Sequence, residues 1–279
     1  MNRTSRAAIA QETVEIANRG WYETPAGKRV DISAAMDRCL SGTALYRPGE
    51  LDRLPPRTGH PAGLHAAFEV ANETSLAAAR RLVVERGCSA TMCLNFASAK
   101  NAGGGFLGGS QAQEESLARA SGLYRSLLTQ DEYYAANRAC GTCLYTDHMI
   151  FSPAVPVFRD DEGQLLEEPY CLDIVTAPAV NKGAILKNEP QRAHDIGPTM
   201  RGRIENLLRL AADRGCEHLI LGAWGCGVFR NDPEEVASLF AFVLGGEPFR
   251  NRFRTIVFAV LDSAPDERTI GPFRRIWGS

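Results

Sequence analysis

The sequence predicts an α/β fold, with a central sheet covered by helices on both faces. Apolar strand-like runs alternate with amphipathic helix-like stretches along most of the 279 residues, and this alternation is typical of α/β proteins. Several strand-like runs, such as SATMCLNFA at 89–97 and RTIVFAVLD at 254–262, are apolar almost throughout. Strands of that kind are buried on both faces, which requires a layer of helices on each side of the sheet.

Local patterns predict the individual elements in order. Apolar residues at helical spacing, with end signals such as Gly87 and Pro233, indicate helices, and short apolar runs between turns indicate strands. The expected helices lie at 5–20, 33–40, 74–87, 113–128, 131–138, 197–214 and 232–244. The expected strands lie at 28–32, 66–72, 89–97, 148–158, 171–177, 217–225 and 254–262.

Two segments are predicted to lie outside regular structure. Four prolines and three glycines indicate a loop at 46–63. The polar segment 181–197 fits either a lid over a ligand or a disordered loop.

Composition excludes several classes of protein. The chain has 33 acidic and 31 basic residues, so it lacks the positive charge that binding a long nucleic acid requires. No segment reaches the ~18 apolar residues of a membrane span, and the start lacks the apolar core of a secretory signal. Eight cysteines are too few for a disulfide scaffold. We expect a cytoplasmic protein that binds neither DNA nor membranes.

The most informative segment runs from Asn95 to Glu115 and joins an apolar strand to a helix. It contains five glycines within seven residues. Because glycine lacks a Cβ atom, such a loop can bring backbone N–H groups against a ligand, and open α/β sheets bind ligands at the carboxyl ends of their strands. A flexible surface connection is the alternative. The spacing is neither a P-loop nor a Rossmann motif, so no cofactor is expected.

Gln113, Glu114 and Glu115 fall in the first turn of the helix after the glycines. The helix dipole stabilises a carboxylate there by roughly 0.3–1 kcal/mol, so capping alone would explain both glutamates. Adjacent helical residues point about 100° apart and do not face each other across a sugar, as the carboxyl pair of most glycosidases does. A catalytic role would therefore need one carboxyl to act first as acid and then as base.

The triple glycine, seven residues, and then Gln-Glu-Glu together resemble the motif of bacterial-type poly(ADP-ribose) glycohydrolases. The similarity runs from NFASAKNAGGG through QEESLARASGLY to LGAWGCGVFRNDP, roughly residues 65–262. It implies a macrodomain-like fold, a three-layer α/β/α sandwich with a mixed sheet. Residues 61–279 would form this catalytic domain, and residues 1–60 an N-terminal helical accessory region. The resemblance also implies that Glu115 is the catalytic carboxylate and that Glu114 positions the ribose.

The same resemblance implies two loops that bind ADP-ribose. Backbone groups of the second loop would contact the pyrophosphate and Phe229 the terminal ribose, although a tight strand–helix turn would also account for this loop. The animal-type motif has Asp-Phe-Ala-Asn where this chain has NFAS, which makes Asn101 the candidate for a side-chain contact to ribose. The implied ligand-binding residues are Asn101, Gly103, Gly104, Gly105 and Gln113 in the first loop, and Gly225, Cys226, Gly227, Val228 and Phe229 in the second.

No pattern of residues favours a metal site. Cys140 and Cys143 form a CxxC pair, but no second pair of ligands follows at zinc-binding spacing. The five histidines show neither HxH nor HExxH spacing, and no carboxylate cluster resembles a magnesium site. We interpret the two cysteines as ordinary thiols and expect a metal-independent enzyme.

These observations favour hydrolysis of the ribose–ribose O-glycosidic bonds of poly(ADP-ribose), with release of ADP-ribose. Bacterial-type members cap the terminal ribose with an accessory element, so the resemblance implies that cleavage proceeds mainly from the polymer end. Poly(ADP-ribose) or ADP-ribosylated proteins would be the substrates. Two alternatives stay open: a non-catalytic macrodomain that reads ADP-ribose, and a hydrolase of mono-ADP-ribosylated protein.

Overall fold

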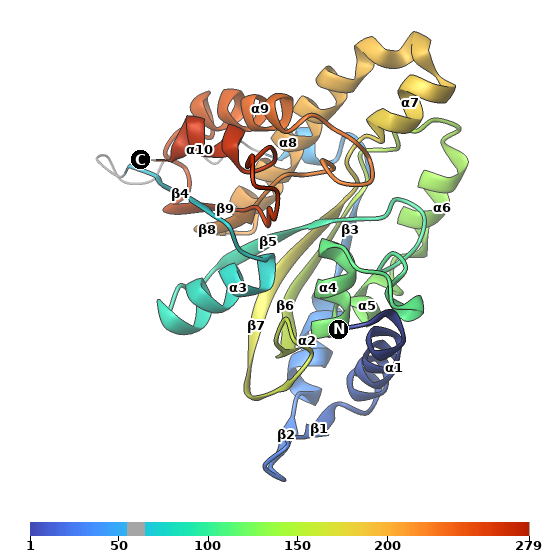
Figure 1. The fold of residues 1–279 in the computed structure, drawn as a ribbon, viewed down its shortest axis with the longest axis vertical. Coiled ribbons are helices and arrows are strands. Elements are labelled where there is room, and N and C mark those ends of the chain that lie inside the picture. The colour runs from blue at the N-terminus through green and yellow to red at the C-terminus, as the bar shows by residue number, and fades with distance from the viewer. Residues whose placement is uncertain (55–64, 279) are drawn as a thin grey trace.

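A seven-stranded mixed sheet forms the centre of the computed structural model, which describes residues 1–54 and 65–278 (Figure 1). The strand order is β3-β6-β7-β5-β8-β9-β4. The strands are β3 (Ala44–Tyr46), β4 (Ala67–Ala71), β5 (Thr91–Phe96), β6 (Met149–Arg159), β7 (Leu165–Ala177), β8 (His218–Leu221) and β9 (Thr255–Ala259). From β7 to β4 neighbouring strands are parallel, whereas β6 is antiparallel to both β7 and β3.

Helices cover both faces of this sheet and confirm the predicted α/β fold (Figure 1). One buried cluster joins the sheet to α8, α9 and α10 through side chains such as Leu207, Phe240 and Phe273. A second cluster lies on the other face and includes Leu76 and Leu117. The helices are α1 (Arg3–Arg19), α2 (Ser33–Gly42), α3 (Ser75–Arg80), α4 (Gln113–Ala120), α5 (Leu123–Leu127), α6 (Asp131–Ala139), α7 (Lys182–Asn188), α8 (Ile196–Asp213), α9 (Pro233–Gly245) and α10 (Gly271–Trp277). None of the helices in the described ranges combines the length and hydropathy that crossing a membrane requires.

The N-terminal region combines α1, a small hairpin of β1 (Trp21–Glu23) and β2 (Arg29–Asp31), and α2. Ile16 and Tyr22 are buried in a small cluster that also contains Phe158 of β6. The next strand in the chain, β3, follows α2 and pairs with β6 at the edge of the central sheet. The predicted domain boundary at residue 60 and half of the predicted loop 46–63, residues 55–63, lie outside the described residues.

Some predicted boundaries are wrong. The single helix expected at 113–128 is divided into α4 and α5 at Ser121, which forms a β-bridge with Val157 of β6. Its hydroxyl accepts from the Leu123 N–H and donates to the Leu117 carbonyl, so the polar groups at the break have partners. The strand expected at 171–177 begins at Leu165, and the strand expected at 217–225 ends at Leu221.

Among the α-helices and strands of the described residues, β1, β3, α7 and α10 were not predicted, and none is longer than seven residues. An element of this length holds too few apolar residues to show a period. The segment 181–197 folds into α7, a 3₁₀ turn at Pro190–Asp195 and the start of α8, so the disordered interpretation is wrong. It lies beside the second glycine-rich loop, because the Gly183 N–H donates to the Phe229 carbonyl at 2.9 Å.

Candidate active site

Both glycine-rich loops begin at the carboxyl ends of neighbouring strands in the central sheet. β5 and β8 are neighbouring parallel strands, and the loops at 97–112 and 222–232 start where these strands end. The carboxyl ends of parallel strands are where α/β sheets bind ligands. The fold therefore brings together the two segments that were predicted to bind one ligand.

The triple glycine forms a tight turn against the paired glutamates. Gly103 and Gly104 have φ values of +65° and +59°, which residues with a side chain rarely adopt. A Cβ atom on Gly104 would collide with the Glu115 carboxylate and lie 3.2 Å from Oε2 of Glu114. The next residue, Gly105, donates its N–H to Oε1 of Glu115 at 3.0 Å. Glycine is thus required at 104 both by the backbone and by the space that the carboxyl groups occupy.

Gln113 attaches the start of α4 to β5 and α3. Its Oε1 accepts from the Phe96 N–H at 2.8 Å. Its Nε2 donates to the Leu94 carbonyl at 2.7 Å and to Oγ of Ser75 at 3.0 Å. The amide of this predicted ligand-binding residue is therefore engaged by the protein, and its evident effect is to place the two glutamates that follow.

Glu114 lies at the bottom of the site and is only 3% exposed. Its Oε2 accepts from the Ser98 N–H at 2.6 Å, and its Oε1 accepts from Nδ2 of Asn95 at 3.3 Å. Burial raises the pKa of Glu114 to about 8, with a smaller rise from Glu115, and these hydrogen bonds oppose the rise. A pKa of about 8 favours the protonated form of this carboxyl at neutral pH. In the sequence, Asn95 and Ser98 are visible only as departures from a motif.

The raised pKa of Glu114 predicts how its replacement changes stability with pH. An unfolded glutamate titrates near 4.5 and the folded one near 8, so the folded state holds the extra proton between these values. The contribution of the carboxyl to stability is complete below about pH 4.5 and decreases as the pH rises towards 8. Glutamine stays neutral, so the Tm of Glu114→Gln relative to wild type should increase from pH 5 to pH 8 and then level off. Thermal melts at pH 5 to 9 test this, and parallel Tm curves would contradict it.

Three arginines donate hydrogen bonds to backbone carbonyls in the second half of the first loop, at residues 108–110. Arg3 and Arg6 of α1 each donate from Nε, to the carbonyls of residues 108 and 109, both at 2.8 Å. Arg119 of α4 donates to the carbonyl of residue 110 at 3.2 Å. A Cβ atom on Gly109 would collide with the carbonyl oxygen of Arg3, so α1 lies directly against the loop. These arginines were not predicted, because no local pattern in residues 1–20 indicates which loop this helix contacts.

The second loop turns sharply at Gly225. Its φ is +76°, and a Cβ atom there would collide with Nδ2 of Asn231. The Asn231 N–H donates to the Gly225 carbonyl at 3.0 Å, and its side chain donates to the Val180 carbonyl at 2.8 Å. Asn231 was not predicted and closes the loop.

The other predicted residues of the second loop differ in exposure. Val228 is 85% exposed, and Gly227 is also exposed. Cys226 is partly buried, and burial raises its pKa to about 12. A raised pKa favours the neutral thiol over the thiolate, which is the nucleophilic form of cysteine. The loop therefore offers backbone groups and the Phe229 ring to a ligand.

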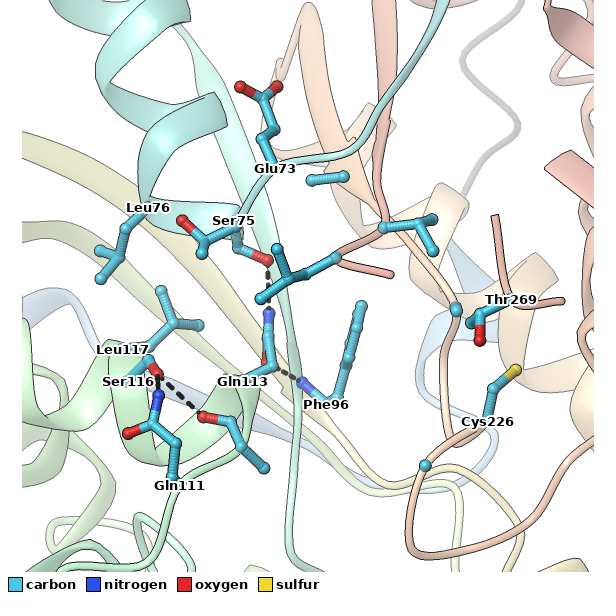
Figure 2. Close-up of a pocket in the computed structure, with 17 residues that line it drawn as sticks. Glu73, Ser75, Leu76, Phe96, Gln111, Gln113, Ser116, Leu117, Cys226 and Thr269 are labelled. Carbon is cyan, nitrogen blue, oxygen red and sulfur yellow. Dashed lines mark hydrogen bonds between the residues drawn. The ribbon is translucent and has the colours of Figure 1, made fainter. Parts of the chain in front are cut away.

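A cavity of about 390 Å³ lies beside the two loops (Figure 2). Three predicted binding residues line it, namely Gln113, Cys226 and Gly227, whereas Asn101, Glu114 and Glu115 do not. Residues that were not predicted extend its wall towards the ends of β4 and β9. Among these are Glu73, Leu76, Phe96, Val260 and Thr269.

The CxxC pair consists of free thiols. Sγ of Cys140 lies 3.2 Å from the carbonyl oxygens of both Asn137 and Thr142 and donates to them. Within residues 1–54 and 65–278, no three His, Cys, Asp or Glu side chains are grouped so as to hold a metal ion.

The mixed sheet, its two helical layers and the paired loops define a macrodomain-like protein. A family model described as microbial-type PARG, catalytic domain, matches residues 10–160. PARG denotes poly(ADP-ribose) glycohydrolase, and the chain belongs to this microbial-type family. It is therefore a glycosidase, as the resemblance implied.

Solved structures of this family match the chain closely. Poly(ADP-ribose) glycohydrolase from Thermomonospora curvata is 49% identical, with 98% of this chain and 99% of that chain covered and a TM-score of 0.92. The same enzyme bound to the inhibitor ADP-HPD gives 48% identity, the same coverage and a TM-score of 0.90. The enzyme from Deinococcus radiodurans in complex with ADP-ribose is 48% identical over 88% of this chain and 98% of that chain, with a TM-score of 0.81. No curated protein matches the chain.

Proposed function

We propose that this glycosidase removes ADP-ribose from the end of poly(ADP-ribose), with Glu115 as both acid and base. The observation that supports this most directly is the difference between the two carboxyl groups. Glu114 is buried, whereas Glu115 is partly exposed and accepts a 3.0 Å hydrogen bond from Gly105 of the triple glycine. Of the two carboxyl groups, Glu115 is thus the more accessible to an attacking water.

The reaction requires one proton to be donated to the leaving 2′-oxygen and one to be accepted from the attacking water. Protonated Glu115 donates to the 2′-oxygen while the bond from that oxygen to the anomeric carbon of the terminal ribose breaks. Positive charge then develops on the ribose ring. Water adds to the anomeric carbon and gives a proton to the Glu115 carboxylate, which restores the acid. The carboxyl acts directly in both steps, so the proposed mechanism uses no metal.

The remaining parts of the site bind and orient the substrate. Glu114, which is neutral at pH 7, donates a hydrogen bond to a hydroxyl of the terminal ribose. Backbone N–H groups of Gly225–Val228 hold the pyrophosphate, whose negative charge stabilises the cationic ring. Asn101 is exposed in the first loop, where its side chain can contact the same ribose.

The cavity in Figure 2 is proposed to take the adenosine end of the substrate. It continues from the second loop, where the pyrophosphate is placed, towards the ends of β4 and β9. Adenine presents apolar faces and a polar edge. The wall offers Phe96, Leu76 and Val260 for the faces and Glu73 and Thr269 for the polar groups.

Cleavage from the polymer end is supported by the position of α1 against the first loop. Arg3 and Arg6 bond to that loop, and we propose that the N-terminal region blocks a further ribose from extending there. Digestion of long poly(ADP-ribose) should release mainly ADP-ribose monomer from the earliest time points. Because the restriction is steric, it should change little with salt.

Gel or chromatographic analysis of end-labelled and uniformly labelled polymer distinguishes the two modes. A ladder of intermediate oligomers before monomer would show that internal cleavage dominates and that the N-terminal region is no cap. Parallel incubation with a mono-ADP-ribosylated protein tests the alternative substrate. We also propose a cytoplasmic location, which the eight free cysteines support.

A further inference from the structure

Arg119 is a buried cation that takes no part in the proton transfers described above. It is only 6% exposed, and it lies in α4 one helical turn after Glu115. Residues four apart in a helix lie on the same face, with Cβ atoms about 5–6 Å apart. The side chain of Arg119 is therefore a neighbour of the proposed acid.

Arg119 differs from a buried arginine such as Arg159 in the groups to which it donates. Arg159, which is 3% exposed, forms a 2.6 Å ion pair with Glu12. Arg119 instead donates to two neutral oxygens, the Ser110 carbonyl at 3.2 Å and Oε1 of Gln111. In the part of the chain that the structure describes, no carboxylate forms an ion pair with it. Neutral partners satisfy its N–H groups but leave its positive charge uncompensated, which is costly in a buried position.

The charge of Glu115 acts on this guanidinium. Burial lowers the pKa of Arg119, Arg6 of α1 lowers it further, and the charge of Glu115 opposes both effects. An attraction between two charges is mutual, so the cation that Glu115 stabilises also stabilises the anionic form of Glu115. Arg119 can therefore act on the charge state of the proposed acid.

A series of hydrogen bonds through the first loop also joins the two side chains. Oε1 of Glu115 accepts from the Gly105 N–H at 3.0 Å, and the Gly105 carbonyl accepts from the Ser110 N–H at 3.2 Å. The Ser110 carbonyl in turn accepts from Nη1 of Arg119. Because Glu115 and Arg119 also share one helix, these bonds close a ring. A displacement of Arg119 would be transmitted through this ring to the carboxyl of Glu115.

We propose that Arg119 is a positioning residue for the reaction, which fixes the Glu115 carboxyl and stabilises the negative charge that it gains when it protonates the leaving oxygen. The proposal rests on the proposed function, in which Glu115 is the acid. Charge that develops in a buried site is stabilised most by a group that is already in place. Arg119 meets that condition, because its hydrogen bonds hold it before substrate arrives.

Arg119→Gln tests the proposal, because glutamine can still donate to the Ser110 carbonyl but carries no charge. Its kcat on poly(ADP-ribose) should fall at least about tenfold. Its KM, and its Kd for ADP-ribose measured by calorimetry, should stay within about threefold of wild type. Arg119→Lys keeps the charge and should return kcat to within about threefold of wild type. If Arg119→Gln does not fold, Arg119→Met, whose apolar side chain suits a buried position, replaces it with the same expectation.

Arg159→Gln is the matched control for the loss of a buried arginine. Arg159 donates to Thr13 and to the Gly163 carbonyl, which lie outside both glycine-rich loops. This variant should lower Tm as Arg119→Gln does, but its kcat should stay within about threefold of wild type. A comparable fall in kcat in both variants would show that buried arginines support the fold alone, and would overturn the proposal.

Three further outcomes would also overturn the proposal. They are wild-type kcat in a folded Arg119→Gln or Arg119→Met, an Arg119→Lys variant as slow as Arg119→Gln, and an ADP-ribose Kd that rises as much as kcat falls. If Glu115→Gln is inactive while Arg119→Gln has wild-type kcat, the proposed function stands without this role for Arg119. Full activity in Glu115→Gln would instead overturn the proposed function itself.

Discussion

Glu115→Gln is expected to lower kcat about 10³-fold while the affinity for ADP-ribose stays within about threefold. Glutamine keeps the oxygen that accepts from the Gly105 N–H, so the loop and the binding site should be retained. It can neither give a proton to the leaving 2′-oxygen nor take one from water. Single-turnover digestion of labelled polymer measures the rate, and calorimetric titration with ADP-ribose measures the affinity.

Glu234→Gln is the matched control for the helix-capping explanation. Glu234 lies in the first turn of α9 as Glu115 does in α4, and it is exposed, with an ion pair to Arg275. If Glu115 only stabilises its helix, both variants should lose roughly 0.3–1 kcal/mol of stability and neither should lose activity. Full activity in Glu115→Gln would therefore remove the proposed mechanism. Loss of activity in Glu115→Gln alone supports it.

The sequence predicted those strands in which burial on both faces produces a continuous run of apolar residues. β5 and β9 are buried on both faces, and their apolar runs showed this in the sequence. Ser121 shows the limit of such reasoning. The apolar pattern continues from α4 into α5, but a tertiary contact with β6 interrupts the helix. Only the folded chain reveals that contact.

The candidate site was predictable where its residues lie close together in the sequence. Gly104 and Glu115 are separated by one loop, so a local motif contains both, and the structure places them in contact. Arg3 bonds to the same loop from 105 positions away, and Tyr145 meets Phe229 only because α6, α7 and the second loop converge. Such contacts leave no signal at fixed spacing in a single sequence.

Gly104→Ala is expected to reduce kcat/KM at least ~10²-fold, because a displacement of about 1 Å at a reacting group costs that much. The added methyl group would collide with the Glu115 carboxylate and approach Glu114. Alanine also disfavours the φ of +59° at this position by about 1–2 kcal/mol. The loop must therefore move, the acid must move, or both. Initial rates on polymer, together with Tm, measure these effects.

Gly108→Ala is the control within the same loop. Position 108 is not in the left-handed region, and a Cβ atom there would meet only Nη2 of Arg3, at 3.8 Å, an ordinary contact. This variant should keep wild-type kcat/KM and Tm. If the loop served only as a flexible connection, alanine at either position would have the same small effect. Equal activity of Gly104→Ala and Gly108→Ala would thus contradict the close packing of the triple glycine against the acid. A loss confined to Gly104→Ala would show that the missing side chain at 104 is what allows Glu115 to occupy its place.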